Sequence, residues 1–510
     1  MDGTTDDSHD YAPFGRPIFD GPEARSLSRV GVVDIGSNSI RLVVFDGAAR
    51  SPAYFYNEKV MAGLGSGLAE TGRLNPEGKV RALAALKRFA ALAEAMEVDP
   101  MSVVATAAMR EAEDGPEFAE TIARETGLVP LVIDGADEAK LSAQGVLLGW
   151  PTAYGLVSDI GGSSMELAEI SGGRVGRTLS SRLGPLRLQS LDSPKKIRRA
   201  IEKGIADLRT DLGMQSDRLF LVGGSWRAIA RIDMERRGYP LHVLHEYRMT
   251  RDDLVAAIDY LDQNDLQEIR RACGFSESRA ALLPLASQVL RELVRVFQPH
   301  DIAVSSYGIR EGMLYEQMPD AVRDRDPLIE ACRFAEAKDA RMPGFGRKLH
   351  RSLAPIFPDA GEDRYRIHRA ACLLHDVSWR AHPDYRHEVC FDLATRANLG
   401  GLTHQERVFI GLALLHRYKN SRSGTRIETL LPILTDAEVR EAETLGRAMR
   451  FGAMFSGLKA ERMPQMGIAD GHLTLDLQPG TSALYGEVAE SRLKALAESL
   501  GLDGVAVSGR

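Results

Sequence analysis

An internal repeat is the feature that most constrains the fold of this chain. VVDIGSNSIRLVVFDG (Val32–Gly47) aligns without gaps on VSDIGGSSMELAEISG (Val157–Gly172), 125 residues further along the chain. Seven of the sixteen positions are identical, including the pair Asp34 and Asp159. Each copy has the pattern of a strand, an aspartate, a turn rich in Gly and Ser, and a returning strand. Two such hairpins, each beginning a sub-domain, predict a duplicated fold with a cleft between its halves.

The pattern along the chain changes at several points and suggests a domain division. Strand-like and helical segments alternate from Val30 to about residue 320, which favours an α/β core. Beyond residue 320 the hydrophobic pattern is helical until about residue 455, and a short segment with strand-like and helical patterns follows. The expected parts are a disordered tail rich in Asp, Gly, Pro and Ser (1–28), lobe I (29–140), lobe II (141–322), a helical domain (323–455) and a small α+β domain (456–510).

Composition excludes several classes of protein. The 510 residues carry 64 Lys+Arg against 71 Asp+Glu, a net charge of −7, which gives no sign of nucleic-acid binding. No apolar run approaches the roughly 20 residues that span a bilayer, so no membrane association is expected. The first residues lack the apolar core of a signal peptide, and the four cysteines form no CxxC pair. These features predict a cytoplasmic protein with reduced thiols.

The turns of the two hairpins are candidate phosphate loops. Small residues and free backbone N–H groups allow close approach of a phosphate. An aspartate before each turn, Asp34 or Asp159, suits Mg²⁺ beside phosphoryl oxygens. A third Gly-rich turn begins a helix after a strand and is a weaker candidate. The predicted phosphate-binding residues are Asp34, Gly36, Ser37, Asn38, Ser39, Gly161, Gly162, Ser163, Ser164, Gly223, Gly224 and Ser225.

Taken in order, these segments resemble the exopolyphosphatase / guanosine pentaphosphate phosphohydrolase family of the sugar-kinase/actin superfamily. The resemblance rests on DIGSNSIRL and DIGGSSMEL, and on LGSGLAETGRL, TAAMREA, GADEAKL, RLGPLRL and YGIREGMLYE, which lie in the order of the family's segments. It implies a duplicated, actin-like (ribonuclease H-like) two-lobe core, followed by an all-helical HD-like domain and a small α+β domain. A homodimer formed through the helical region is also implied by the resemblance.

The resemblance assigns roles to residues that the pattern alone does not single out. Glu138 in GADEAK matches the catalytic glutamate that activates the attacking water. Arg110 matches an arginine that clamps phosphate oxygens. Glu166 is implied as a third metal-holding carboxylate beside Asp34 and Asp159, with Mg²⁺ as the cofactor. On residue type alone, Glu138 is an ordinary acidic residue at a helix start and Arg110 a surface ion-pair residue.

The sequence is compatible with three functions. The first is processive removal of terminal orthophosphate from inorganic polyphosphate, favoured because a nucleotide needs no long basic channel such as the C-terminal half could provide. A bulky Trp226 is also expected to crowd a nucleoside at the third loop, which favours a phosphate chain over ATP. The second is hydrolysis of guanosine pentaphosphate in the same cleft, alone or as a dual activity. The third, less favoured, is a nucleotide-binding regulator without catalysis.

The helical region carries a His375-Asp376 pair that resembles the motif of HD phosphohydrolases. No complete set of metal ligands fits the spacing around it, so a structural pair is expected there. The same region is rich in Arg and Lys, either as solvated helix faces or as a channel for an anionic chain. The basic residues are Arg341, Arg347, Lys348, Arg351, Arg364, Arg366, Arg369, Arg417, Lys419, Arg422 and Arg426.

Overall fold

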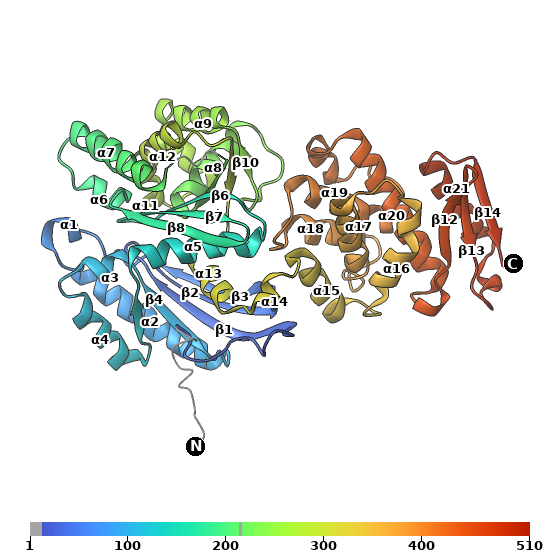
Figure 1. The fold of residues 1–510 in the computed structure, drawn as a ribbon, viewed down its shortest axis with the longest axis horizontal. Coiled ribbons are helices and arrows are strands. Elements are labelled where there is room, and N and C mark those ends of the chain that lie inside the picture. Colours follow the sequence, from blue (N-terminus) through green and yellow to red (C-terminus); the bar gives the residue numbers. More distant parts are fainter. Residues whose placement is uncertain (1–12, 214–216, 510) are drawn as a thin grey trace, which may run out of the picture. The chain divides into compact units, whose positions relative to one another are not determined.

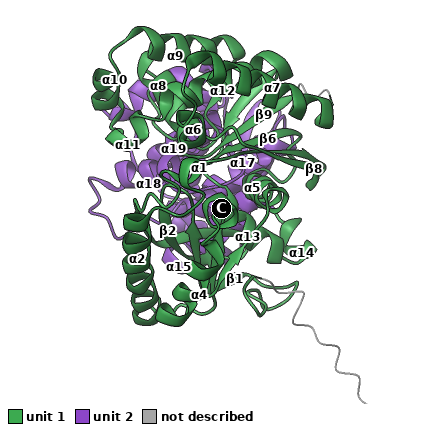
Figure 2. Cartoon of the chain, turned by 90° about the vertical axis from the view of Figure 1, so that its left-hand side faces the viewer, with its two compact units in different colours: residues 1–325 green, residues 326–510 purple. Residues whose placement is uncertain are grey.

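The computed structural model describes residues 13–213 and 217–509. The chain divides into two compact units, unit 1 (Met1–Arg325) and unit 2 (Asp326–Arg510), shown in green and purple in Figure 2. The expected lobes (29–140 and 141–322) fall within unit 1, and the expected C-terminal domains fall within unit 2 apart from residues 323–325.

The first repeat begins a mixed sheet in unit 1. Its strand order is β3-β2-β1-β4-β5, with the β1–β2 hairpin antiparallel and β4 and β5 parallel to β1. The strands are β1 (Ser26–Ile35), β2 (Ile40–Ala48), β3 (Ser51–Val60), β4 (Met101–Ala105) and β5 (Pro130–Val132). The associated helices are α1 (Leu68–Thr71), α2 (Pro76–Ala95), α3 (Ala107–Glu111) and α4 (Gly115–Thr126).

The second repeat begins an equivalent sheet. Its order is β10-β11-β9-β6-β7-β8, and β9 runs parallel to β6 as β4 does to β1. The strands are β6 (Gly155–Ile160), β7 (Met165–Ser171), β8 (Arg174–Ser181), β9 (Arg218–Val222), β10 (Arg248–Met249) and β11 (Asp301–Val304). The helices around it are α6 (Pro185–Gln189), α7 (Pro194–Leu212), α8 (Gly224–Arg236), α9 (Arg251–Gln263), α10 (Leu266–Cys273), α11 (Glu277–Ala280) and α12 (Leu283–Phe297). The short α14 (Asp320–Arg323) lies beside β3 of the first sheet instead (Figure 1). The duplicated hairpin predicted from the repeat is confirmed.

Two helices, α5 (Gly135–Gly149) and α13 (Ile309–Gln317), lie between the two sheets (Figure 1). Side chains alternate between the faces of a strand. Val32 and Val157 therefore pack with α5 in one shared core, whereas Val33 packs on the opposite side with α2. Asp34 and Asp159, each two residues further along, face the same inner layer near the ends of their strands. The predicted actin-like, two-lobe α/β fold is confirmed by this arrangement.

The expectation of a disordered tail over 1–28 is wrong for its described part. Phe14, Ile18 and Phe19 are buried in the same core as Val30, and β1 already begins at Ser26. Average composition hid these large apolar side chains among Pro, Gly and Asp, although their burial fixes the segment. Residues 1–12 lie outside the described residues.

Unit 2 is helical up to Ser456 and then contains a small sheet with one packed helix. The helices are α15 (Pro327–Asp339), α16 (Phe345–Leu353), α17 (Glu362–Leu374), α18 (Arg386–Arg396), α19 (His404–Tyr418), α20 (Asp436–Ser456) and α21 (Glu487–Ser499), with 3₁₀ turns at Ala354–Ile356, Arg426–Ile433, Ala460–Arg462 and Ser482–Leu484. The sheet has the order β12-β13-β14, formed by β12 (Gln465–Ala469), β13 (His472–Asp476) and β14 (Gly504–Ser508). Across residues 13–213 and 217–509, no helix combines the length and apolar composition needed to cross a bilayer.

Candidate active site

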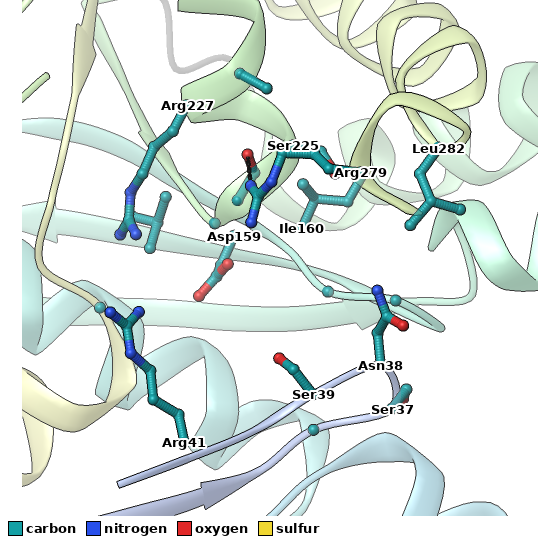
Figure 3. Close-up of a pocket in the computed structure, with 18 of the residues that line it drawn as sticks. Ser37, Asn38, Ser39, Arg41, Asp159, Ile160, Ser225, Arg227, Arg279 and Leu282 are labelled. Carbon is teal, nitrogen blue, oxygen red and sulfur yellow. Dashed lines mark hydrogen bonds between the residues drawn. The ribbon is translucent and has the colours of Figure 1, made fainter. Parts of the chain in front are cut away.

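A cavity of about 450 Å³ in unit 1 brings the two repeat turns together (Figure 3). The catalytic candidate Glu138 and most of the predicted phosphate-binding residues line it. The predicted residues in its lining are Asp34, Gly36, Ser37, Asn38, Ser39, Glu138, Asp159, Gly161, Gly162, Ser164, Gly223, Gly224 and Ser225.

The two turns close in the same way. The N–H of Gly36 donates to the carbonyl of Ser39, and the N–H of Gly161 donates to that of Ser164, each over 3.0 Å. The turns also touch each other, because Ser163 Oγ donates to Ser37 Oγ over 3.0 Å. A Cβ on Gly162 would lie 2.9 Å from Leu186 Cδ1 and 3.2 Å from Ser37 Cβ, so a larger residue there would displace Leu186 and crowd the first turn.

The two repeat aspartates place carboxylates at the cavity. Burial raises the pKa of both Asp34 and Asp159. The nearby Asp34 charge raises the pKa of Asp159 further, whereas the hydrogen bond from Ser142 and the Arg227 charge oppose the rise. At Asp34, the charges of Arg310 and Arg41 oppose it. Ser142 Oγ donates to Asp159 Oδ2 over 2.5 Å, which fixes that carboxylate. Two carboxylates held close in a protein interior favour the arrival of a cation.

Glu138 lies in the first turn of α5 and is 5% exposed. The helix starts at this point because the side chain of Asp134 accepts from the N–H of Asp137 over 2.8 Å. Arg110 Nη1 lies 3.3 Å from Glu138 Oε2 and also donates to the carbonyl of Ile133 over 2.8 Å. Burial raises the pKa of Glu138, and the Arg110 charge opposes the rise. A carboxylate with a raised pKa beside a phosphate cradle is suited to accept a proton from water.

Cationic side chains form the part of the cavity that the sequence did not predict. Among the described residues lining it, six are cationic: Arg41, Lys59, Arg227, Arg231, Arg279 and Arg310. Arg227 is held by the carbonyls of Ser305 and Ser306 at 2.8 and 3.0 Å. Arg41 Nε donates to Asn57 Oδ1 over 2.7 Å, and Arg279 donates to the carbonyl of Gly224.

The cations repel one another. Burial and the Arg310 charge lower the pKa of Arg41 to about 10. Burial, together with Arg279, Arg41 and Arg310, lowers the pKa of Lys59 to about 8. An anion entering the cavity relieves this repulsion, so the arrangement favours a ligand of high negative charge.

The third Gly-rich loop also reaches the cavity, but the prediction that Trp226 crowds a nucleoside there is wrong. Gly223 has φ 97°, and a Cβ there would lie 2.8 Å from Asp159 Oδ1, so glycine is required. Ser225 lines the cavity, whereas Trp226 is 0% exposed and belongs to the core on the outer side of the second sheet. Successive residues of a helix differ by about 100° in direction, which turns the indole away from the loop. Trp226 therefore crowds no ligand.

Three predicted residues stand behind the cavity wall instead of lining it: Arg110, Ser163 and Glu166. Glu166 is the direct cross-strand neighbour of Asp159, is 1% exposed, and accepts from Ser180 Oγ over 3.0 Å. The expected set of three converging carboxylates is not formed: over the described ranges, no three His, Cys, Asp or Glu side chains are arranged as metal ligands.

The residues present nonetheless fit Mg²⁺. That ion keeps several waters and commonly uses one or two carboxylates together with substrate phosphate oxygens. Asp34 and Asp159 both line the cavity, and burial with their mutual repulsion raises the pKa of Asp159. A pair of such carboxylates next to two phosphate-sized turns provides this donor set.

The His375-Asp376 pair of unit 2 lies in a different environment. Arg341 Nη2 lies 2.5 Å from Asp376 Oδ1, and the backbone N–H of Arg341 donates to Oδ2 over 3.1 Å. Although burial opposes ionisation, these hydrogen bonds hold the pKa of Asp376 below its usual range, and burial lowers that of His375 to about 3. The carboxylate is thus paired with a guanidinium. Of the other basic residues in this region, Arg364, Arg366, Arg422 and Arg426 also form ion pairs within unit 2.

Two Asp-bearing hairpins meeting at one polar cavity define an actin-like fold built for handling phosphate. Comparison with known proteins agrees. Residues 43–321 match the Ppx/GppA phosphatase family and residues 346–505 match the exopolyphosphatase C-terminal domain. The chain belongs to the Ppx/GppA phosphatase family, a family of hydrolases.

Individual relatives carry different names. Retrograde regulation protein 2 of Saccharomyces cerevisiae is 25% identical over 445 residues, covering 78% of this chain and 74% of that protein. Exopolyphosphatase 2 of Mycobacterium tuberculosis is 26% identical over 313 residues, covering 56% and 98%. Guanosine-5'-triphosphate,3'-diphosphate pyrophosphatase of Vibrio parahaemolyticus is 23% identical over 424 residues, covering 79% and 82%.

Solved structures share the fold of unit 1. An exopolyphosphatase from Cytophaga hutchinsonii has a TM-score of 0.53 at 24% identity, covering 57% of this chain and 98% of that one. The Ppx/GppA family member of Aquifex aeolicus has a TM-score of 0.50 at 25% identity, covering 57% and 97%.

Proposed function

We propose that this protein is an exopolyphosphatase that removes terminal orthophosphate processively from inorganic polyphosphate. The observation that carries the proposal is the charge of the cavity. Six cationic side chains line it against three carboxylates in the described residues. A single phosphate does not need so many cations, whereas a chain with a charge on every phosphoryl group does.

The chemistry follows from the positions of the residues. The Gly and Ser turns donate hydrogen bonds to oxygens of the terminal phosphate. Glu138 accepts a proton from water as the water oxygen bonds to the terminal phosphorus. The bond from that phosphorus to the bridging oxygen breaks, and the arginines stabilise the negative charge that the shortened chain keeps. Arg110 acts through Glu138 by holding its carboxylate.

Mg²⁺ belongs to the same proposal, with Asp34 and Asp159 as the residues that hold it. When bound, it neutralises charge on the phosphoryl oxygens. Glu166, behind Asp159, supports the carboxylate layer from one side without facing the cavity.

Hydrolysis of guanosine pentaphosphate is a second candidate, supported by a specific observation. The cavity lining also includes three apolar side chains, Leu244, Phe275 and Leu282, besides the Gly223-Gly224-Ser225 loop. With Trp226 directed into the core, this lining can accept a purine. The relative from Vibrio parahaemolyticus carries a name that fits this activity.

The test compares orthophosphate release from long-chain polyphosphate and from guanosine pentaphosphate, with Mg²⁺, for wild type and Glu138→Gln. The expected result is faster release from polyphosphate and a loss of about 10²- to 10⁴-fold in the variant. Faster release from guanosine pentaphosphate would assign the second candidate with the same general base. Binding of either ligand without release, unchanged by Glu138→Gln, would assign a non-catalytic regulator.

A further inference from the structure

A second cavity of about 410 Å³ lies behind the two phosphate turns, also within unit 1. Its lining comes from the loop around α1 in lobe I and from α6 in lobe II. Its lining includes Gly65, Ala69, Glu70, Glu111, Ser163 and Arg187. None of the predicted catalytic residues lines it, and Ser163 is its one predicted phosphate-binding residue among the described lining.

The wall between the two cavities is thin. Ser37 lines the first cavity and Ser163 lines the second, and their hydroxyls are hydrogen-bonded to each other over 3.0 Å. The N–H of Gly65 donates to the carbonyl of Ser37 over 2.8 Å. A Cβ on Gly65 would lie 3.0 Å from Ser37 Cβ and 3.5 Å from Ser163 Oγ. The serine pair, together with Leu186 packed beside Gly162, thus separates the phosphate turns from the second cavity.

The other side of the second cavity reaches solvent. Ala69, Glu70 and Ser190 in its lining are exposed, whereas Gly65 and Ser163 at the wall are buried. Arg187 Nη1 lies 2.7 Å from Glu111 Oε2, an ion pair that joins α6 of lobe II to α3 of lobe I. These two contacts join the lobes through side chains, one through a pair of neutral hydroxyls and the other through an ion pair whose side chains are 28% and 21% exposed. Each contributes modestly to stability, so both can break when the lobes separate.

The two cavities differ in charge. Among the described residues, the charged side chains lining the second cavity are Glu70, Glu111 and Arg187, which carry no net positive charge. The first cavity, by contrast, has an excess of cations. An anion is therefore retained in the first cavity and not in the second.

We propose that the second cavity is the exit port for orthophosphate, opened by breaking the Ser37–Ser163 and Glu111–Arg187 contacts. This inference rests on the proposed function. After cleavage, orthophosphate lies between the two turns, and the shortened chain remains bound on the cationic side. A processive enzyme cannot release the product past the chain it retains. The thin wall at Ser37 and Ser163 gives the product a separate route to solvent.

The proposed exit port can be tested by blocking the second cavity chemically after the protein has folded. All four native cysteines are buried, so Ala69→Cys introduces a selectively reactive thiol at the rim of the second cavity. The folded variant is labelled with a bulky maleimide and compared with its own unlabelled form. Ala91→Cys, exposed on α2 and outside both cavities, is labelled in the same way as the control. Orthophosphate from polyphosphate is measured after acid quench, which counts bound and free product, and with a phosphate sensor, which counts free product.

Labelled Ala69→Cys is expected to show a quenched burst of one orthophosphate per site, followed by turnover slowed roughly tenfold, because release limits the rate. The free-phosphate signal lags behind the acid-quenched signal, the KM for polyphosphate does not rise, and labelled Ala91→Cys turns over normally.

Unchanged turnover in labelled Ala69→Cys would overturn the exit port while leaving the proposed function intact. A raised KM without a burst would also overturn it, because the cavity would then admit substrate. Absence of hydrolysis by wild type would instead remove the proposed function, and the port with it.

Discussion

Arg41 and Glu166 occupy the same position in the two repeats, one with a basic side chain and the other with an acidic one. Each is seven residues after the repeat aspartate and is its direct cross-strand neighbour, Arg41 beside Asp34 and Glu166 beside Asp159. Arg41 lines the cavity, whereas Glu166 is buried behind it and bonded to Ser180. The duplicated hairpins have thus diverged, the first to present a cation to the ligand and the second to support the carboxylates.

Arg41→Gln should weaken the binding of a phosphate chain. A charge-assisted contact contributes about 1.5–3 kcal/mol, so kcat/KM for polyphosphate should fall roughly ten- to hundredfold, mainly through KM. Arg41→Lys, which keeps the charge, should recover part of the loss. Arg198→Gln, 81% exposed on α7, is the matched control. Equal kcat/KM in Arg41→Gln and this control would remove Arg41 from the binding site.

Lys59 makes substrate capture sensitive to alkaline pH. Its pKa is lowered to about 8 by burial and by the charges of neighbouring arginines, so it is protonated below that pH and neutral above it. In wild type, kcat/KM for polyphosphate should therefore decline as pH rises through about 8. Lys59→Arg should remove this decline, and Lys59→Met should lower kcat/KM at neutral pH to the level reached at alkaline pH. An alkaline limb that persists unchanged in Lys59→Arg would mean that another group controls it.

The sequence predicted the carboxylates and the turns of the site better than its cations. Asp34 and Asp159 could be found because the duplication places the same polar pattern twice. Arg227, Arg279 and Arg310 come from separate helices or loops, and only the folded chain brings them to one cavity. Arginine is common on protein surfaces, and no spacing distinguishes these three from ion-pair residues.

The errors at Trp226 and in the N-terminal segment have physical causes of their own. The neighbours of Trp226 in sequence line the cavity, but the direction of a helical side chain changes with each residue. The average composition of the N-terminal segment indicates disorder, whereas burial of Phe14, Ile18 and Phe19 decides its structure. Glu138 came from family resemblance alone. Its carboxylate becomes distinctive only when burial and Arg110 are known.

Arg110→Met should shift the pH dependence of hydrolysis. The Arg110 charge lowers the pKa of Glu138, opposing the rise that burial causes. Without it, the pKa of Glu138 rises further, and a base that must be ionised then works only at higher pH. The acid limb of kcat/KM should move to higher pH, with activity partly restored under alkaline conditions. Arg110→Lys should show a smaller shift, and a loss of activity equal at every pH would contradict the role of Arg110 in holding Glu138.

In unit 2, the guanidinium of Arg341 serves as the cation partner of Asp376, so Arg341→Met should destabilise that unit. The Asp376 carboxylate is 1% exposed, and leaving a buried charge unpaired costs about 3–5 kcal/mol. Trp379, whose Nε1 donates to the carbonyl of Asp339 over 2.8 Å, reports unfolding of this region by fluorescence. Because the pKa of Asp376 is held below its usual range, the wild-type contribution is present above the unfolded pKa and is lost as pH falls through the folded one. The difference in the free energy of unfolding between wild type and Arg341→Met should therefore be large at neutral pH and shrink in acid.

The double variant Arg341→Met/Asp376→Asn, which removes both charges, should be more stable than Arg341→Met. If the single variant were as stable as wild type at neutral pH, the ion pair would contribute nothing to the fold.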